Sequence, residues 1–97
     1  MRPYRFHPDA EAELDEIMRF YKSRQAGLEK RFFHAVEDAI IRIRKNPLIY
    51  RKVEDEIRKC RLPRFPYGLI YRFSNDQIEI IAVMHIRRNP NYWKGRF

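Results

Sequence analysis

The feature that most constrains the fold of this chain is a pair of β-prone runs joined by a short polar turn. The first run extends from Arg64 to Phe73 and is rich in aromatic and β-branched residues, and the second extends from Gln77 to His85. Ser74-Asn75-Asp76 between them is typical of a turn, so we expect a β-hairpin. The second run is apolar at nearly every position, which is typical of a central strand that is covered on both faces.

The length of the chain corresponds to one domain, residues 1–97, with one modest core. No apolar run approaches the ~18 residues that a membrane-spanning helix requires, so we expect no membrane association. The start of the sequence lacks the apolar stretch of a signal peptide, and we therefore expect a cytoplasmic protein. Cys60 is the only cysteine and the three histidines are scattered, so the sequence predicts no disulfide, no metal site and no cofactor.

The charge of the chain points to an anionic partner. Lys and Arg number 21 against 13 Asp and Glu, which gives a net charge of +8. The acids gather early, from Asp9 to Glu16, whereas bases dominate from Arg58 to Arg64 and from Arg87 to Arg96. A basic surface of this kind suits a nucleic acid or an acidic protein, and it also favours solubility.

Two amphipathic helices are expected before the hairpin. Pro8 suits the first turn of a helix, acidic residues follow it, and apolar residues then recur at helical spacing until about Arg24. Gly27 interrupts this pattern, and a second apolar stripe extends from Leu28 to Ile43 and ends at Asn46-Pro47. Because the connection is short, we expect the two helices to be antiparallel.

Short strands complete the expected sheet. Tyr4–Phe6 is one candidate, residues 48–56 are expected to be a loop, and Ile57–Leu62 alternates between apolar and basic positions. The order β-α-α-β-β-β predicts an α+β fold in which the helical hairpin packs on one face of a mostly antiparallel, four-stranded sheet. We expect the opposite face to stay partly open and to carry basic residues.

Motifs from nearly the whole chain occur in an order typical of one protein family. They are Phe6-His7-Pro8-Asp9-Ala10-Glu11-Ala12-Glu13-Leu14, Arg31-Phe32, Asn46-Pro47, Arg64-Phe65-Pro66-Tyr67-Gly68-Leu69-Ile70-Tyr71-Arg72, and Val83-Met84-His85-Ile86-Arg87-Arg88-Asn89-Pro90 before Trp93. Taken together, these motifs resemble the RelE/ParE superfamily of bacterial toxins from type II toxin–antitoxin modules. The chain is more similar to the ParE branch, whose members are often labelled plasmid stabilisation proteins.

The resemblance implies the toxin half of a toxin–antitoxin pair with one of two activities. ParE-like members bind DNA gyrase and poison it, whereas RelE-like members cleave mRNA at the ribosome. Members of both kinds are neutralised by a small antitoxin, so we expect a hetero-oligomer with an acidic antitoxin. We expect a ParE-like gyrase inhibitor that is not itself an enzyme; the alternatives are a ribosome-dependent mRNA endoribonuclease and a non-toxic, basic interaction module.

The residues at the expected catalytic positions disfavour a nuclease. Gly68 stands where the resemblance places a strand arginine in the toxins that cleave mRNA. If the chain is a nuclease, His85, Arg88 and Arg72 are the candidate catalytic residues, because RNA cleavage needs an acid or base and cations near the phosphate.

Two groups of residues are candidates for binding. The expected target contacts are Arg87, Arg88, His85, Tyr92 and Trp93. The expected antitoxin contacts are Lys59, Arg61 and Arg64, because an acidic partner suits a basic face. Several of these residues have structural alternatives. Arg87 and Arg88 suit a solvated turn, His85 at the strand end suits a hydrogen bond to the next loop, and Trp93 suits packing over the core.

Overall fold

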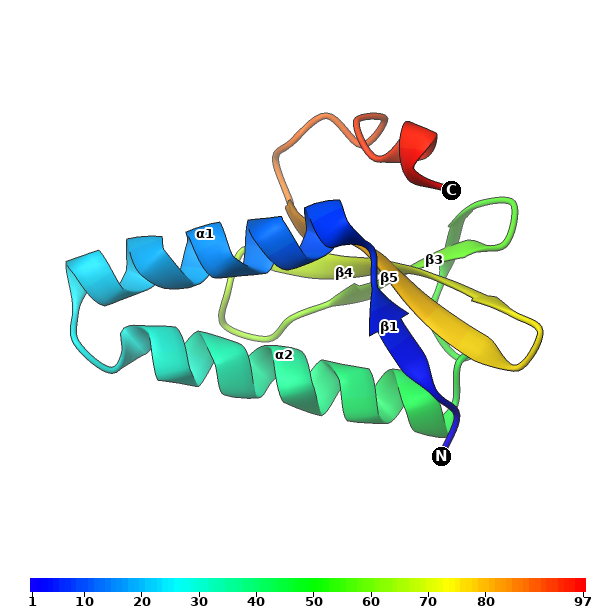
Figure 1. The fold of residues 1–97 in the computed structure, drawn as a ribbon, viewed down its shortest axis with the longest axis horizontal. Helices are drawn as coiled ribbons and strands as arrows, with labels where there is room; N and C mark the ends of the chain where they lie inside the picture. Colours follow the sequence, from blue (N-terminus) through cyan, green and yellow to red (C-terminus); the bar gives the residue numbers. More distant parts are fainter.

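The computed structural model describes residues 1–97, and the two helices form a hairpin on one face of a single sheet (Figure 1). The elements are β1 (Tyr4–Phe6), α1 (Pro8–Arg24), α2 (Leu28–Lys45), β2 (Lys52–Glu54), β3 (Ile57–Arg61), β4 (Tyr67–Ser74), β5 (Gln77–His85) and a 3₁₀ turn, η1 (Lys94–Arg96). The α+β class, the helical hairpin and the mostly antiparallel sheet are confirmed. Neither α1 nor α2 combines the length and apolar character that a membrane crossing requires.

The sheet has five strands rather than the expected four. Its order is β1-β5-β4-β3-β2, with β1 parallel to β5 and all other neighbours antiparallel. The additional strand, β2, lies within residues 48–56, which the sequence pattern assigned to a loop. Val53 is its one apolar residue and is 43% exposed. This strand therefore lacks the buried apolar alternation by which a strand is recognised in a sequence.

The larger core lies between the helices and the sheet. It is formed by Ala10, Leu14, Ile17, Phe32, Val36, Ala39, Ile40 and Ile43 from the helices and by Cys60, Leu62, Leu69, Tyr71, Ile78, Ile80 and Val83 from the sheet side. The Tyr71 hydroxyl is buried and donates a 2.7 Å hydrogen bond to the Pro47 carbonyl, which fastens the segment after α2 to β4. Cys60 and Leu62 share the helix face, as the alternation of this strand predicted.

The central strand β5 contains a β-bulge at Ile81. Its pairing with β4 shifts by one residue between Ile80 and Ala82, so Ile81 is an extra residue in the strand. Strict alternation from Ile80 would place Val83 and His85 on the face away from the helices. The bulge reverses this phase, and Val83 belongs to the core under the helices. As a result, the side chain at the end of β5 is presented on the same face as α1.

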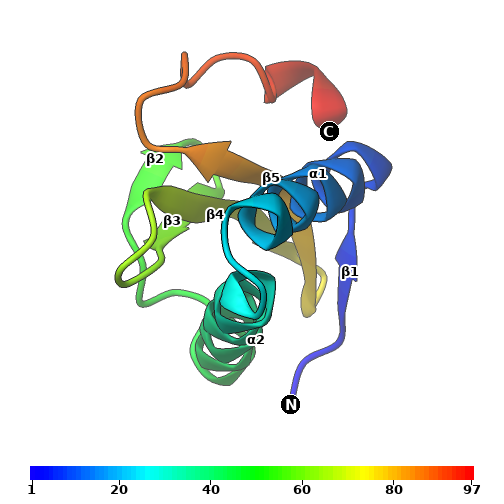
Figure 2. The ribbon, with the colours of Figure 1, turned by 90° about the vertical axis from the view of Figure 1, so that its left-hand side faces the viewer.

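The opposite face of the sheet is partly covered by the C-terminal segment, residues 86–97 (Figures 1 and 2). Trp93 is 2% exposed and packs in a second apolar cluster with Ile57, Ile70, Ile81, Ala82 and Met84. The partly open face expected from the sequence is therefore smaller than predicted. What remains uncovered lies mainly along β3, where Lys59 and Arg61 point away from the core that underlies the helices.

Candidate functional site

The chain that leaves β5 forms a compact turn, which we call the C-terminal turn (residues 86–91). Nδ1 of His85 accepts a 3.0 Å hydrogen bond from the Arg87 N–H, and Oδ1 of Asn89 accepts a 2.9 Å bond from the Asn91 N–H. His85 therefore makes the loop hydrogen bond that was its structural alternative. These two local bonds fix the direction in which Arg87 and Arg88 leave the backbone.

The two arginines of the C-terminal turn differ in their surroundings. Arg87 is exposed to solvent. The guanidinium carbon of Arg88 lies 3.5 Å from the centroid of the Tyr92 ring, and its Nη1 is 3.7 Å from Oε2 of Glu13. The Arg88 side chain is still 53% exposed, so some of its guanidinium N–H groups can donate hydrogen bonds to a partner. Burial raises the pKa of Tyr92, and the ring beneath Arg88 therefore stays neutral.

The C-terminal turn is anchored to α1 through Glu13 and Arg96. Arg96 donates one hydrogen bond of 3.0 Å to each carboxylate oxygen of Glu13 and a third, also of 3.0 Å, to the Ile81 carbonyl. Oε1 of Glu13 also accepts a 2.9 Å bond from the Val83 N–H. The Arg96 and Glu13 side chains are only 13% and 14% exposed. A bidentate, charge-assisted pair of this kind is strong and holds a defined geometry.

Tyr92 and Trp93 lie beneath the C-terminal turn. Trp93 is part of the second apolar cluster, as its structural alternative predicted, and the Tyr92 hydroxyl is buried without a well-aligned hydrogen-bond partner. Among the residues expected to contact a target, Arg87 and Arg88 therefore form the accessible surface and His85 borders it. Tyr92 and Trp93 support this surface from below.

A hollow of about 320 Å³ adjoins the turn, between α1 and the end of β5. It is lined by Glu13, Glu16, Ile17, Phe20, Tyr67, Val83, His85 and Arg88. Phe20 is 48% exposed, and the His85 ring packs edge-on against Tyr67 with a centroid distance of 5.1 Å. The hollow thus combines apolar walls with charged groups, a composition that suits a side chain of a partner protein.

The three candidate residues of a nuclease do not gather at one point. Arg72 is 3.5 Å from Glu79 in an ion pair on the face of β4 opposite the helices. His85 pairs with Tyr67, which lies five residues from Arg72 along β4, so roughly 16 Å of strand separate the two positions. The bulge also places His85 on the opposite face from Arg72. The structure therefore brings His85 and Arg88 together and leaves Arg72 apart.

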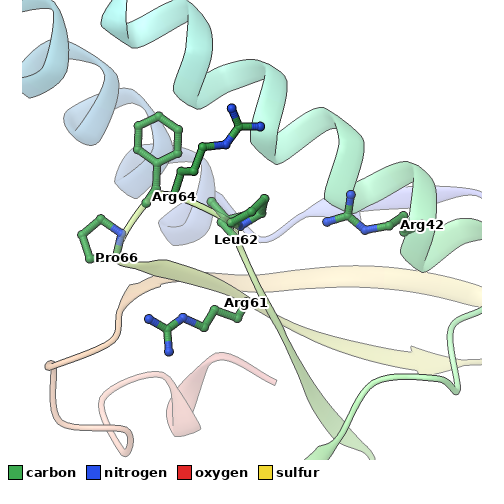
Figure 3. A pocket seen from close by; sticks show the side chains of 7 residues that line it. Arg42, Arg61, Leu62, Arg64 and Pro66 are labelled. Carbon is green, nitrogen blue, oxygen red and sulfur yellow. The ribbon is translucent and has the colours of Figure 1, made fainter.

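A second basic surface surrounds the loop between β3 and β4. Arg42, Arg61 and Arg64 line a hollow of about 710 Å³ (Figure 3). Its remaining walls are Leu62, Pro63, Phe65 and Pro66. Arg64 adopts the left-handed backbone conformation with φ of 67°, which shapes the tight loop. Arg42 comes from α2 and donates a 3.1 Å bond to the Tyr50 hydroxyl. Sequence reasoning missed Arg42, because nothing in the local pattern links α2 with this loop.

Lys59 lies on the other side of β3 from Arg64. With Arg61 it lines a smaller hollow whose other residues are Arg51, Lys52 and Val53. A Cβ added at Gly68 would lie 3.2 Å from Cε of Lys59, so the lysine stem covers the position where a cleaving toxin is expected to carry arginine. The residues expected to contact an acidic partner, Lys59, Arg61 and Arg64, therefore belong to two hollows that share Arg61.

Comparison with known proteins decides the family. The family model described as "ParE toxin of type II toxin-antitoxin system, parDE" matches residues 4–90. This chain belongs to the ParE toxin family. Two relatives named "Toxin ParE2", from Mycobacterium tuberculosis strains CDC 1551 / Oshkosh and ATCC 25618 / H37Rv, are each 30% identical to it over 91 residues, which cover 93% of this chain and 87% of the relative. The resemblance read from the motifs is confirmed.

A solved structure supports the fold. A chain from a structure described as "Chromosomal ParDE TA system from P. aeruginosa" aligns with a TM-score of 0.64 at 19% identity, and the match covers 88% of this chain and 96% of that chain. The ParE family match ends at residue 90. Tyr92, Trp93 and Arg96, which brace the C-terminal turn, therefore lie beyond the segment that the family model matches.

Proposed function

We propose that this ParE-family chain is the toxin of a type II toxin–antitoxin pair, that it inhibits growth by binding DNA gyrase, and that an acidic antitoxin neutralises it. The names of its relatives support the toxin assignment. The P. aeruginosa neighbour, which is described as part of a ParDE TA system, supports an antitoxin partner. Gyrase as the target follows from the resemblance of the motifs to ParE-like members.

The observation that carries target binding is the pair of arginines on the braced turn, beside a hollow with apolar and charged walls. Arg87 and the half-exposed Arg88 stand on the C-terminal turn, and Phe20 is exposed at the adjoining hollow. Arginine and aromatic side chains on a rigid support are typical of the residues that contribute most to protein–protein binding. We assign the target contact to this surface, with His85 at its border.

The mode of action is binding rather than catalysis. An RNA-cleaving site needs an acid or base and cations around one phosphate. Here Arg72 is paired with Glu79 on the face opposite His85, so the candidate residues do not surround one phosphate. This separation supports a toxin that acts by occupying its target.

The antitoxin contact is assigned to the basic surface around β3. Lys59, Arg61, Arg64 and Arg42 line its two hollows, and none of them is in an ion pair with an acidic residue of this chain. An acidic polypeptide is the partner that such a surface attracts and associates with rapidly.

Expression of the chain alone under an inducible promoter, combined with two assays of the purified protein, tests this proposal. We expect growth arrest, inhibition of gyrase supercoiling and no cleavage of mRNA. Arg87→Glu with Arg88→Glu should abolish the arrest, and Lys30→Glu, on an exposed part of α2, should retain it. Codon-boundary cuts by primer extension would favour the endoribonuclease, and normal growth at full expression would favour the non-toxic module.

A further inference from the structure

The Arg88 guanidinium is in close contact with the aromatic ring of Tyr92. Its central carbon lies 3.5 Å from the ring centroid, which is the separation of atoms in van der Waals contact. The planar guanidinium must therefore lie flat on the ring, because tilting it would push a nitrogen into the ring atoms. Its charged neighbour, the Glu13 carboxylate, is 3.7 Å away and beyond hydrogen-bond distance. The ring is thus the closest support of this side chain.

Tyr92 reaches this position because the chain folds back after Arg88. Oδ1 of Asn89 accepts the 2.9 Å bond from the Asn91 N–H, and the Asn89 carbonyl accepts a 3.4 Å bond from the Tyr92 N–H. The next residue, Trp93, is 2% exposed and packs in the second apolar cluster. The backbone of Tyr92 is therefore fixed on both sides, and its ring forms an immobile platform.

The contribution of Tyr92 comes from its aromatic face rather than from its hydroxyl. The hydroxyl is buried without a well-aligned hydrogen-bond partner, and burial of a polar group in this state is unfavourable. The face attracts cations through the ring quadrupole. Besides Arg88, the guanidinium carbon of Arg96 lies 5.0 Å from the ring centroid.

The other arginine of the C-terminal turn has no such support. Arg87 is exposed, and the ion pair and cation–π contact of the turn belong to Arg88. A long, unsupported side chain loses conformational entropy when a partner immobilises it, and this loss weakens binding. Arg88 is already ordered by the ring, so it avoids most of this cost.

We propose that Tyr92 is a positioning residue, whose ring holds the Arg88 guanidinium flat so that its exposed N–H groups are aligned before the target binds. The inference deepens the proposed gyrase contact and rests on it for the identity of the target. The ordering of Arg88 rests only on contacts within this chain.

The order of Arg88 is measured on the full, wild-type protein. NMR relaxation of the arginine Nε–H groups reports the fast motion of each guanidinium. We expect a high order parameter for Arg88 and a low one for Arg87, and the ring should shift the side-chain protons of Arg88 upfield. In Tyr92→Leu the order parameter of Arg88 should fall to that of Arg87. Equal order parameters for the two arginines in the wild-type protein would overturn the inference, even if no variant folds.

Inhibition of gyrase supercoiling measures the effect on the target contact. Tyr92→Leu should raise the half-inhibitory concentration about five- to tenfold, and Tyr92→Phe, which restores the aromatic face, should recover most of this loss. Tyr4→Leu is the matched control, because Tyr4 of β1 lies 5.1 Å below the guanidinium carbon of Arg44 and not at the turn. It should leave the half-inhibitory concentration within about twofold of the wild-type value.

A double-mutant cycle shows whether Tyr92 acts through Arg88. In an Arg88→Ala background, Tyr92→Leu should cause almost no further loss of inhibition. Arg88→Lys keeps the charge without the planar group and should lose about as much inhibition as Tyr92→Leu.

Three results of these assays would each overturn the inference: an equal effect of Tyr92→Leu with and without Arg88, a loss in Tyr92→Phe as large as that in Tyr92→Leu, or full inhibition by Arg88→Lys. If the wild-type protein does not inhibit gyrase, the proposed target is wrong. The relaxation measurement then still decides whether the ring orders Arg88, so the two failures are distinguished.

Discussion

Arg96 and Glu13 form a bidentate ion pair at the point where β5 loses its outer neighbour. β1 pairs with β5 only as far as Ile80. Beyond that residue, Glu13 accepts the bond of the Val83 N–H and Arg96 donates to the Ile81 carbonyl, so the pair takes the place of a missing strand. It therefore stabilises the sheet edge and the C-terminal turn together, and breaking it should affect both.

Arg96→Gln should destabilise the protein by roughly 2–4 kcal/mol, because the Glu13 carboxylate, which is 14% exposed, loses its bidentate partner and keeps only the longer 3.7 Å contact with Arg88. Urea denaturation followed by circular dichroism measures this change. Lys94→Gln is the matched control from the same segment. The side chains of Lys94 and its partner Glu54 are 45% and 37% exposed, so we expect the unfolding free energy to change by at most about 1 kcal/mol. Equal losses of unfolding free energy for the two variants would show that the Arg96–Glu13 pair contributes no more to stability than an exposed ion pair.

Trp93→Ala should cost roughly 3–5 kcal/mol, because it empties the centre of the second apolar cluster. The melting temperature should fall clearly, and proteolysis should cut the segment after β5 more readily. Phe97→Ala is the control, since Phe97 stacks on Trp93 with a centroid distance of 6.1 Å but is 47% exposed. A cost for Trp93→Ala as small as that for Phe97→Ala would contradict the assignment of Trp93 to the core.

The stability of the protein should fall at alkaline pH because of its buried tyrosines. Burial raises the pKa of Tyr71 far above the ordinary value of about 10. The contribution of the Tyr71 hydroxyl to the unfolding free energy is complete below about pH 10. It is lost as the pH rises further, because the hydroxyl loses its proton more readily in the unfolded chain than in the folded one. Tyr71→Phe should therefore flatten the decline in unfolding free energy between about pH 10 and pH 12, although it costs about 1 kcal/mol at neutral pH through the lost bond to Pro47. An unchanged alkaline slope in this variant would contradict the prediction.

The Cys60 thiol should be unreactive in the native protein. Cys60 is fully buried in the main core, and burial raises the pKa of its thiol. At about pH 8 we expect an aromatic disulfide reagent to label it only at the rate at which the protein unfolds, and to label it fully in urea. Rapid, stoichiometric labelling without denaturant would contradict the burial of this side chain.

Local patterns were sufficient to predict most of the fold. Pro8, Arg24 and Asn46-Pro47 predicted where the two helices begin and end, because such residues affect the backbone only one or two helical turns away. The alternation of β3 likewise assigned Cys60 to the core. The family followed from the order of several motifs, none of which is specific alone.

The features that escaped prediction depend on long-range contacts. In the run from Ile78 to Met84 nearly every residue is apolar, so the bulge at Ile81 leaves no trace in the pattern. Arg96 meets Glu13 across 83 residues of sequence, and no local spacing links the two. Arg42 joins the basic surface only because α2 packs beside the loop after β3. A single sequence carries no signal for such pairs.

The outer edge of β3 also bears on how copies of this protein behave toward one another, because β2 pairs only with the first two residues of β3, Ile57 and Arg58. An unpaired strand edge is a template for self-association. A second copy approaching this edge brings its own Lys59 and Arg61 and a net charge of +8, so repulsion opposes the edge-to-edge strand pairing that the unpaired backbone favours. Salt at about 1 M shortens the screening length to about 3 Å and removes this protection. The positive charge along this one short edge thus keeps copies of the protein apart in dilute salt.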